Sequence, residues 1–126
     1  MVTIDVEQLS QECNAWREIL RSYREEFLQL KSFLQKNATH QSHKEDLLQL
    51  EHLDNQLHIQ LINIHDLKRL IKNHDKQLQL LVQLNNTDMA DEITANHEAL
   101  SADFLALRNR LEEVKEECSL FEGKIA

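Results

Sequence analysis

The 126-residue sequence contains no proline, a single glycine (Gly123), and only one tryptophan, one tyrosine and four phenylalanines. A sheet of short strands needs glycine, proline and similar residues at its many turns, so this composition argues against a β-rich fold. Leucine, glutamine, glutamate and lysine dominate instead, and these residues favour long helices. Composition alone therefore predicts an all-α protein.

Basic residues are also scarce. The chain has 14 basic and 22 acidic residues, and residues 87–126 carry 4 basic against 10 acidic ones. Nucleic acids and anionic membranes bind surfaces that are rich in lysine and arginine, and no segment has such an excess. We therefore expect neither nucleic acid nor a membrane as a partner.

Long apolar runs and abundant cysteine are missing as well. No segment approaches the roughly 18 consecutive apolar residues that cross a bilayer. The N-terminal residues MVTIDVEQLSQE carry acidic groups where a signal peptide has basic and apolar ones. Two cysteines, Cys13 and Cys118, are too few for a disulfide scaffold. These features predict a cytoplasmic protein with reduced thiols.

Apolar residues recur at heptad spacing in three runs. The first run alternates intervals of three and four residues, at Val6, Leu9, Cys13, Trp16, Leu20, Tyr23, Phe27, Leu30 and Leu34. The second run, at about 44–84, places two polar residues on this edge, Gln60 and His74. The third run continues to Ile125 and places one polar residue there, His97. Heptad spacing of this kind indicates helices that pack along an apolar edge.

The segments between the runs, 37–46 and 85–92, are rich in residues that cap helices and form turns. Neither contains proline or glycine, so one continuous rod is the alternative. The heptad phase changes across both segments by amounts that differ from the insertions of three or four residues found in continuous coiled coils. We therefore predict one domain, 1–126, with helices at about 4–36, 44–84 and 88–122. They form an antiparallel up-down-up three-helix bundle roughly 50 Å long.

Reversing the chain near residues 40 and 87 aligns the three apolar edges in layers. The predicted layers are Val6 with His74 and Leu100, Leu9 with Ile71 and Phe104, Cys13 with Leu67 and Leu107, and Trp16 with Ile64 and Leu111. This register separates Cys13 from Cys118 by about 20 Å along the axis, which is too far for a disulfide.

In length, number of helices and a tryptophan on the first helix, the layout resembles spectrin-type repeats and the regulatory three-helix bundles of syntaxin-like proteins. The resemblance is architectural and implies a three-helix bundle. It transfers no functional motif to this chain.

Catalytic motifs are missing from the sequence. It has no glycine-rich phosphate loop, no His-Glu-x-x-His, no Cys-x-x-Cys and no Glu-x-x-His pair of the di-iron bundles. We expect a protein that is not an enzyme and has no cofactor.

The histidines make metal binding an alternative function. His74 and His97 fall in adjacent inward layers, and Asp5 or Glu7 lies at the same level of the first helix, which gives two imidazoles and a carboxylate. The simpler interpretation is a hydrogen-bonded polar layer that fixes the register, and we favour it. A buried, neutral His74 would also make the fold less stable in acid, below a pH of about 6.

A third polar position suggests another register contact. Gln60 is predicted near Tyr23, and its amide is placed to bond the tyrosine hydroxyl.

Several apolar residues fall outside the predicted core. Ile59 and Ile62 project from the far side of the second helix, and Leu105 lies outside on the third. Scattered surface apolar residues are one explanation, and a second contact surface is the one that we prefer. The leading hypothesis is a non-catalytic interaction or scaffolding protein that forms a homodimer, or binds another protein, through this surface. The alternative is a small metal-binding or metal-sensing bundle that uses His74, His97 and a first-helix carboxylate.

Overall fold

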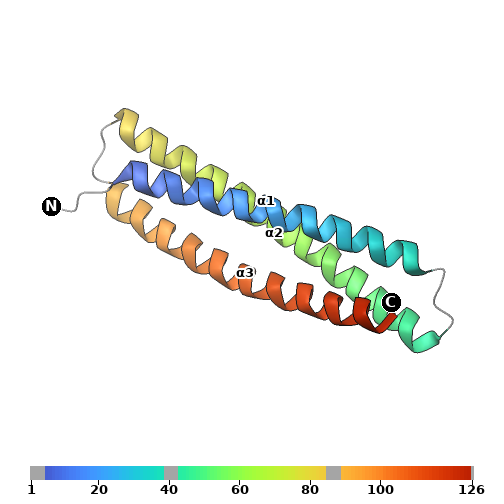
Figure 1. The fold of residues 1–126 in the computed structure, drawn as a ribbon. Coiled ribbons are helices and arrows are strands. Elements are labelled where there is room, and N and C mark those ends of the chain that lie inside the picture. The colour runs from blue at the N-terminus through green and yellow to red at the C-terminus, as the bar shows by residue number, and fades with distance from the viewer. Residues whose placement is uncertain (1–4, 39–42, 85–88, 126) are drawn as a thin grey trace.

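A computed structural model describes residues 5–38, 43–84 and 89–125. These residues form three helices, α1 (Val6–Asn37), α2 (Lys44–Leu84) and α3 (Ala90–Ile125), and no strand. The helices lie side by side in alternating directions, so the predicted antiparallel three-helix bundle is confirmed (Figure 1). Residues 39–42 and 85–88, in the two predicted turns, lie outside the described ranges.

The helix termini carry capping and charged residues that suit them. Asp5 is the N-cap of α1, and its carboxylate accepts a hydrogen bond of 3.1 Å from the backbone N–H of Gln8. Acidic residues occupy the first turn of each helix, namely Glu7, Glu45, Asp46, Asp91 and Glu92. Negative charge near a helix N-terminus stabilises the helix through its dipole.

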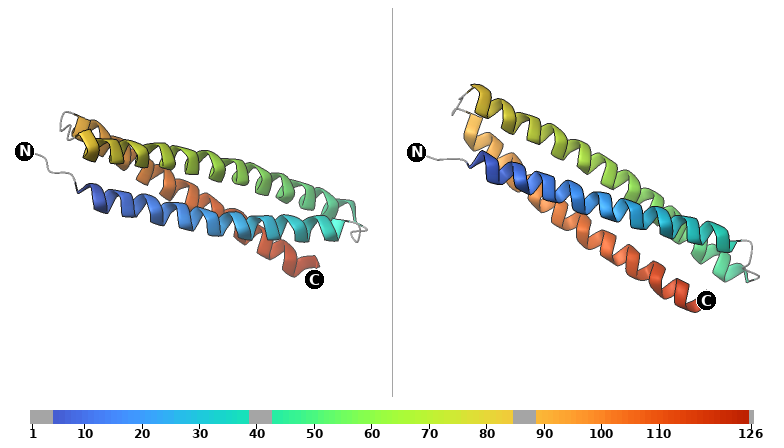
Figure 2. Two further views of the ribbon diagram at one scale, coloured as in Figure 1. Left: turned by 90° about the horizontal axis from the view of Figure 1, so that it is seen from above. Right: turned by 45° about the horizontal axis from the view of Figure 1, so that its top comes forward.

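The helices twist around one another with α2 as the common neighbour. α1 and α3 each pack mainly against α2, and they meet each other less extensively. The start of α1, the end of α2 and the start of α3 gather at one end of the bundle in both views of Figure 2. Residues at heptad spacing on all three helices are fully buried, among them Leu20, Leu57, Ile64, Ile71, Leu111 and Val114. Each such aliphatic side chain stabilises the fold by about 1.5–3 kcal/mol.

The register of α1 differs from the prediction by one heptad. Cys13, and not Val6, lies beside His74 and His97. Trp16, and not Leu9, stacks on Phe104, with ring centroids 5.9 Å apart. Because a heptad edge looks the same every seven residues, sliding a helix by seven keeps apolar side chains facing the core. Contacts between helices select among these registers.

Polar contacts between α1 and α2 favour the observed register. Asp75 accepts hydrogen bonds from Ser10 at 2.9 Å and Arg17 at 3.1 Å, both on α1. Near the other end of the pair, Lys31 lies 3.1 Å from Asp54. The predicted proximity of His74 on α2 and His97 on α3 is confirmed, because their rings are in direct contact.

The predicted bond between Gln60 and Tyr23 is wrong. Gln60 is buried, and its side-chain oxygen accepts a hydrogen bond of 3.1 Å from Asn63, one turn along α2. The Tyr23 hydroxyl donates to Glu112 of α3 instead. A local partner within the same helix was available to the glutamine, so it did not need the tyrosine.

Both cysteines are buried and free, as predicted. The observed register places Cys13 beside His97, which is 21 residues before Cys118 on α3. The thiols are therefore roughly 30 Å apart along the bundle, at 1.5 Å per residue.

None of the helices within residues 5–38, 43–84 and 89–125 has the length and apolar character needed to cross a membrane.

Candidate functional site

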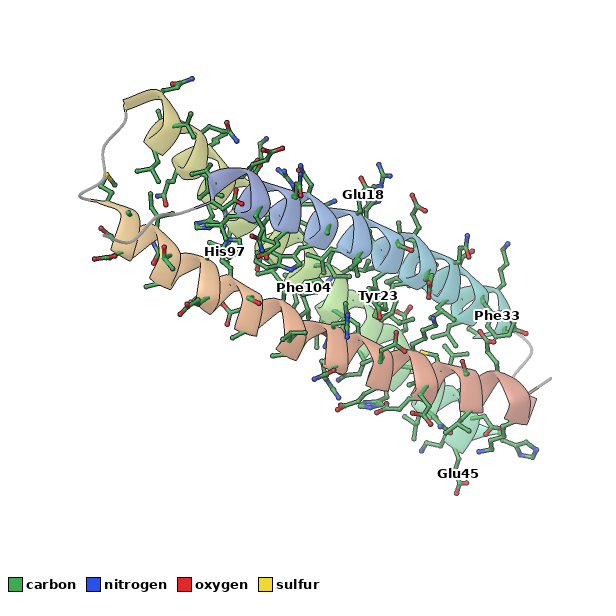
Figure 3. The ribbon with its side chains drawn as sticks, turned by 60° about the vertical axis from the view of Figure 1, so that its left-hand side comes forward. Glu18, Tyr23, Phe33, Glu45, His97 and Phe104 are labelled. Atoms are coloured by element: carbon green, nitrogen blue, oxygen red, sulfur yellow. The ribbon has the colours of Figure 1, made fainter. Side chains whose placement is uncertain are left out.

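One cluster of chemically reactive side chains lies inside the bundle, where all three helices meet. Cys13 comes from α1, His74 from α2 and His97 from α3. Each occupies the apolar edge of its helix and therefore points at the common axis. His97 lies between the ribbons in Figure 3, whereas the labelled Glu18 and Glu45 point outward. All three members of the cluster are at most 5% exposed.

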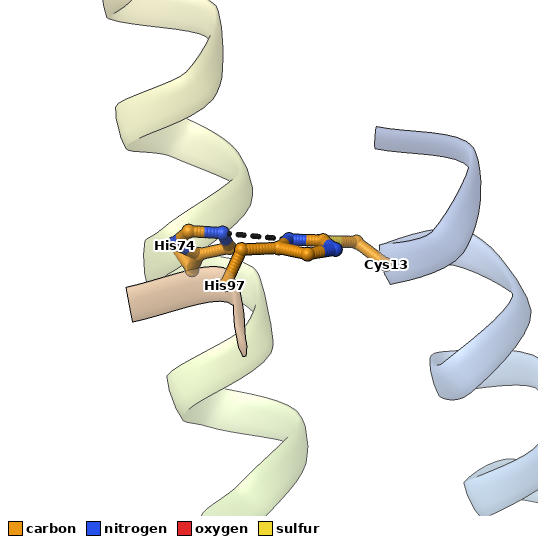
Figure 4. Close-up of side chains that lie close together, drawn as sticks. All are labelled: Cys13, His74 and His97. Carbon is orange, nitrogen blue, oxygen red and sulfur yellow. Dashed lines mark hydrogen bonds between the residues drawn. The ribbon is translucent and has the colours of Figure 1, made fainter. Parts of the chain in front are cut away.

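The two imidazoles are joined directly. His74 Nε2 and His97 Nδ1 are 3.0 Å apart, and the dashed line in Figure 4 marks this hydrogen bond. The second nitrogen of His97, Nε2, lies 2.6 Å from the carboxylate of Glu12. A carboxylate can only accept, so Nε2 of His97 carries the hydrogen and donates it to Glu12. Glu12 is 41% exposed and links the buried pair to the surface.

This network leaves one buried nitrogen without a partner. If His97 is neutral, its Nδ1 accepts from Nε2–H of His74, and Nδ1 of His74 keeps an unused lone pair. If His97 is protonated, it donates to Nε2 of His74, and Nδ1–H of His74 is unused. In both cases Nδ1 of His74 is the orphan, and it has no hydrogen-bond partner among the described residues. A buried polar atom without a partner is costly, so its presence calls for an explanation.

Aromatic rings close one side of the cluster. Trp16, one turn after Cys13, packs its ring on His97 with centroids 4.8 Å apart and planes inclined by 31°. Phe104 also stacks on Trp16, with ring planes inclined by 26°. These rings hold His97 in place and keep water from its face.

Burial controls the charges in the cluster. Desolvation, followed by the negative charge of Asp75, raises the pKa of the Cys13 thiol to about 11, so the thiol is protonated at neutral pH. Desolvation, followed by the electrostatic effect of the neighbouring His97, lowers the pKa of His74, while Asp75 opposes this shift. His74 is therefore neutral at pH 7, with a lone pair on one nitrogen.

The structure brings together only part of the predicted metal set. His74 and His97 are in contact, as their adjacent layers implied. Asp5 caps α1 and Glu7 is exposed, and the carboxylate that reaches His97 belongs to Glu12. Asp75, next to His74, is engaged by Ser10 and Arg17 of α1.

Two members of the site, Cys13 and Glu12, were not predicted to lie there. The one-heptad displacement of α1 explains both omissions, because the predicted register placed Val6 at the level of the histidines. Cys13 is the only residue with a strong metal-ligating side chain on the apolar edge of α1. A search for the register that groups cysteine with the inward histidines would have found this arrangement.

A thiol and two imidazoles form a donor set suited to borderline and soft metal ions. One ligand atom from each of Cys13, His74 and His97 can be chosen so that all three lie within 4.8 Å of one another. The arrangement has no serine or cysteine nucleophile held against a catalytic base and a pocket, since the buried thiol is protonated and enclosed.

A second feature lies on the opposite side of α2. Ile59 and Ile62 are 39% and 48% exposed, on the surface that the sequence suggested. Of the four other exposed aliphatic residues of α2, Leu48, Leu70 and Leu80 lie on the same side of the helix as these two, whereas Val82 does not. At 100° per residue these five side chains fall within an arc of about 80°, and Leu70 is at the edge of this arc that is nearest to the core. We call them the outer strip. Leu105 is also 48% exposed but belongs to α3 and is not part of the strip.

Comparison with protein family models, curated proteins and solved structures finds no match to this chain.

Proposed function

We propose that this protein is a non-catalytic interaction module that forms a homodimer through the outer strip of α2. The observation that carries the proposal is the alignment of five exposed aliphatic side chains, Leu48, Ile59, Ile62, Leu70 and Leu80, on one face of a helix whose other face is already buried. Apolar residues on both faces of a helix are expected where both faces are covered. The reduced, buried cysteines suit a function in the cytoplasm.

The strip lies on a second edge of α2, on which half of the positions carry apolar residues. Intervals of three or four residues connect the positions Leu48, His52, Asn55, Ile59, Ile62, Asp66, Leu70, Asn73, Gln77 and Leu80. Such an edge packs best against another helix with the same spacing. It extends from Leu48 to Leu80, or about 48 Å at 1.5 Å per residue.

The strip matches itself when two copies of α2 pair antiparallel about a two-fold axis near residue 64. Leu48 then faces Leu80 of the second copy, Ile59 faces Leu70, and Ile62 faces Asp66. The same axis pairs Asn55 with Asn73, whose amides can hydrogen-bond and fix the register. A surface that complements itself under two-fold rotation is the requirement for a symmetric dimer.

Charges beside the strip favour this pairing. In an antiparallel helix pair, the same flank of each helix faces its counterpart. Glu51 and Lys76 lie on one flank, both exposed, and the axis near residue 64 brings Glu51 of one copy opposite Lys76 of the other. The dimer therefore contains this ion pair twice.

Sedimentation over a range of concentrations tests the dimer. We expect wild-type protein to form dimers and the Ile59→Glu/Ile62→Glu double variant to be monomeric. Each glutamate disrupts the interface at two symmetric places, so the dissociation constant should rise by more than about a hundredfold. Leu28→Glu, at a 41% exposed position of α1, is the matched control and should leave the dimer intact.

Charge exchange tests the pairing direction. Glu51→Lys should weaken the dimer, and Glu51→Lys combined with Lys76→Glu should restore it. Asp66→Leu should tighten the dimer, because it replaces the one acid facing Ile62 by an apolar side chain. Leu105→Glu reports whether α3 contributes to the same contact. A wild-type protein that is monomeric at every concentration, or a double variant that dimerises like wild type, would refute the proposal.

Binding of a metal ion is a second candidate function. It is favoured by a separate observation, the buried group of Cys13, His74 and His97 with ligand atoms within 4.8 Å of one another.

A further inference from the structure

We infer that Cys13, His74 and His97 bind one Zn²⁺ ion in the core of the bundle, with Glu12 as the residue that orients His97. This inference rests on the second candidate function and specifies its ion and its ligands. It is independent of the outer strip, which faces away from the core.

The donor set selects the ion. Zn²⁺ prefers imidazole nitrogen and thiolate sulfur in tetrahedral geometry, whereas Ca²⁺ and Mg²⁺ require oxygen ligands. Two histidines and one cysteine fill three tetrahedral positions. A water molecule would supply the fourth ligand, because the carboxylate of Glu12 is engaged by Nε2–H of His97 on the other side of the ring.

The distances require small movements only. Ligand atoms around a tetrahedral zinc ion lie roughly 3.3–3.6 Å apart, given metal distances of about 2.0–2.3 Å. His74 Nε2 and His97 Nδ1 are 3.0 Å apart, so they need to separate by a few tenths of an ångström. One ligand atom from each of the three residues can be chosen so that no pair is more than 4.8 Å apart, so the group needs to contract by at most on the order of 1 Å. A change of rotamer or a slight helix shift provides this movement.

Glu12 holds His97 in the orientation that a metal ligand needs. Since Nε2–H of His97 donates to Glu12, the Nδ1 nitrogen of a neutral His97 carries the lone pair and faces His74. Metal-bound histidines commonly have a carboxylate on their second nitrogen in this way. The ion would replace the hydrogen bond between the two imidazoles.

Charge balance also favours the ion. Binding releases the Cys13 thiol proton to solvent, and the resulting thiolate together with Glu12 neutralises the two positive charges of zinc. A buried ion whose charge is matched by its surroundings avoids the large penalty of an isolated buried charge.

The experiment uses the full chain without an affinity tag, stripped with a chelator and kept reduced by a phosphine. Zn²⁺ and Co²⁺ are titrated separately, and Co²⁺ reports its ligands through its absorption spectrum. We expect one ion per chain, a thiolate-to-cobalt charge-transfer band, and a higher melting temperature with Zn²⁺.

Cys118 provides the matched control, because it is a second fully buried, free thiol in the same bundle. Cys13→Ala should weaken zinc binding by about a hundredfold or more and abolish the charge-transfer band, whereas Cys118→Ala should keep both. Circular dichroism checks that both variants are folded. Glu12→Gln should weaken zinc binding by about 10–100-fold, and circular dichroism checks that the metal-free variant is folded.

The possible failures are distinguishable. If wild-type protein binds neither ion, both the second candidate function and this inference are wrong. If one ion binds but Cys13→Ala binds it as tightly as wild type, or if Cys118→Ala loses the cobalt band, the ion occupies another site and only the ligand assignment is wrong.

Discussion

The two cysteines occupy equivalent positions at different levels of the bundle. Both lie on an apolar helix edge, both are fully buried, and burial raises the pKa of each thiol to about 11. Cys13 faces two histidines from the other helices, with Glu12 and Asp75 close by. Cys118 has Val114 and Phe121 as its buried neighbours along α3, and the charges that affect it, Glu122 and Glu117, belong to its own helix.

The comparison distinguishes the packing of a thiol from the chemical groups that surround it. Burial and pKa are nearly the same for the two thiols, so neither property identifies a site. What distinguishes Cys13 is the set of groups that other helices place opposite it. The two levels should consequently respond differently to substitution, to metal and to pH.

The largest loss of stability is expected from a substitution at the apolar level of the bundle, around Cys118. Phe121 is 1% exposed, and Phe121→Ala removes a buried ring, leaving a cavity that the helices fill only in part. We expect the free energy of unfolding to fall by about 3–5 kcal/mol, with or without metal. Urea denaturation monitored by circular dichroism measures it. A loss below about 1 kcal/mol would mean that this end of the bundle is loosely packed.

A smaller loss of stability is expected from substitutions at the polar level of the bundle, around Cys13, His74 and His97. In metal-free protein, His97→Leu leaves Nε2 of His74 without its partner, which should cost about 1–3 kcal/mol. The double variant His74→Leu/His97→Leu removes both polar groups and should cost less than the single variant. Denaturation of the two single variants and the double variant forms a cycle that isolates the coupling. Strictly additive losses would contradict a hydrogen-bonded pair.

The smallest effect is expected from acid. Burial lowers the pKa of His74 in the folded state, so below the unfolded pKa of about 6.5 the unfolded chain takes up a proton that the folded chain resists. The stability of metal-free protein should therefore be complete above that pH and decrease below it, by at most about 1.4 kcal/mol per pH unit for this group.

His74→Leu tests the assignment of that acid response. The imidazole of His74 lies near His97 and Asp75, and His97 connects it to Glu12. Because these groups also titrate, the unfolding free energy of the variant is compared with that of wild type over the same pH range. A variant with the same acid profile as wild type would show that another group is responsible.

Much of the bundle was predictable, since heptad spacing at residues such as Trp16, Ile64 and Leu111 determines which face of each helix is buried. The histidine pair was predictable for the same reason, because His74 and His97 fall on those faces. The outer strip was partly predictable. Ile59 and Ile62 are close together in the sequence and indicated an exposed surface. Leu48, Leu70 and Leu80 are far from one another in the sequence, and only their exposure in the structure assigns them to the same surface.

The amino-acid sequence by itself determined three helices, their antiparallel order and their buried faces, because these depend on a local period of apolar residues that any heptad register preserves. The tertiary structure alone decided which heptad of α1 lies opposite which heptad of α2. A slip of seven residues leaves apolar burial almost unchanged, so the choice depends on contacts between helices, such as Ser10 and Arg17 with Asp75. This register places Cys13 and Glu12 beside the two histidines. It therefore determines which reactive side chains meet in the core.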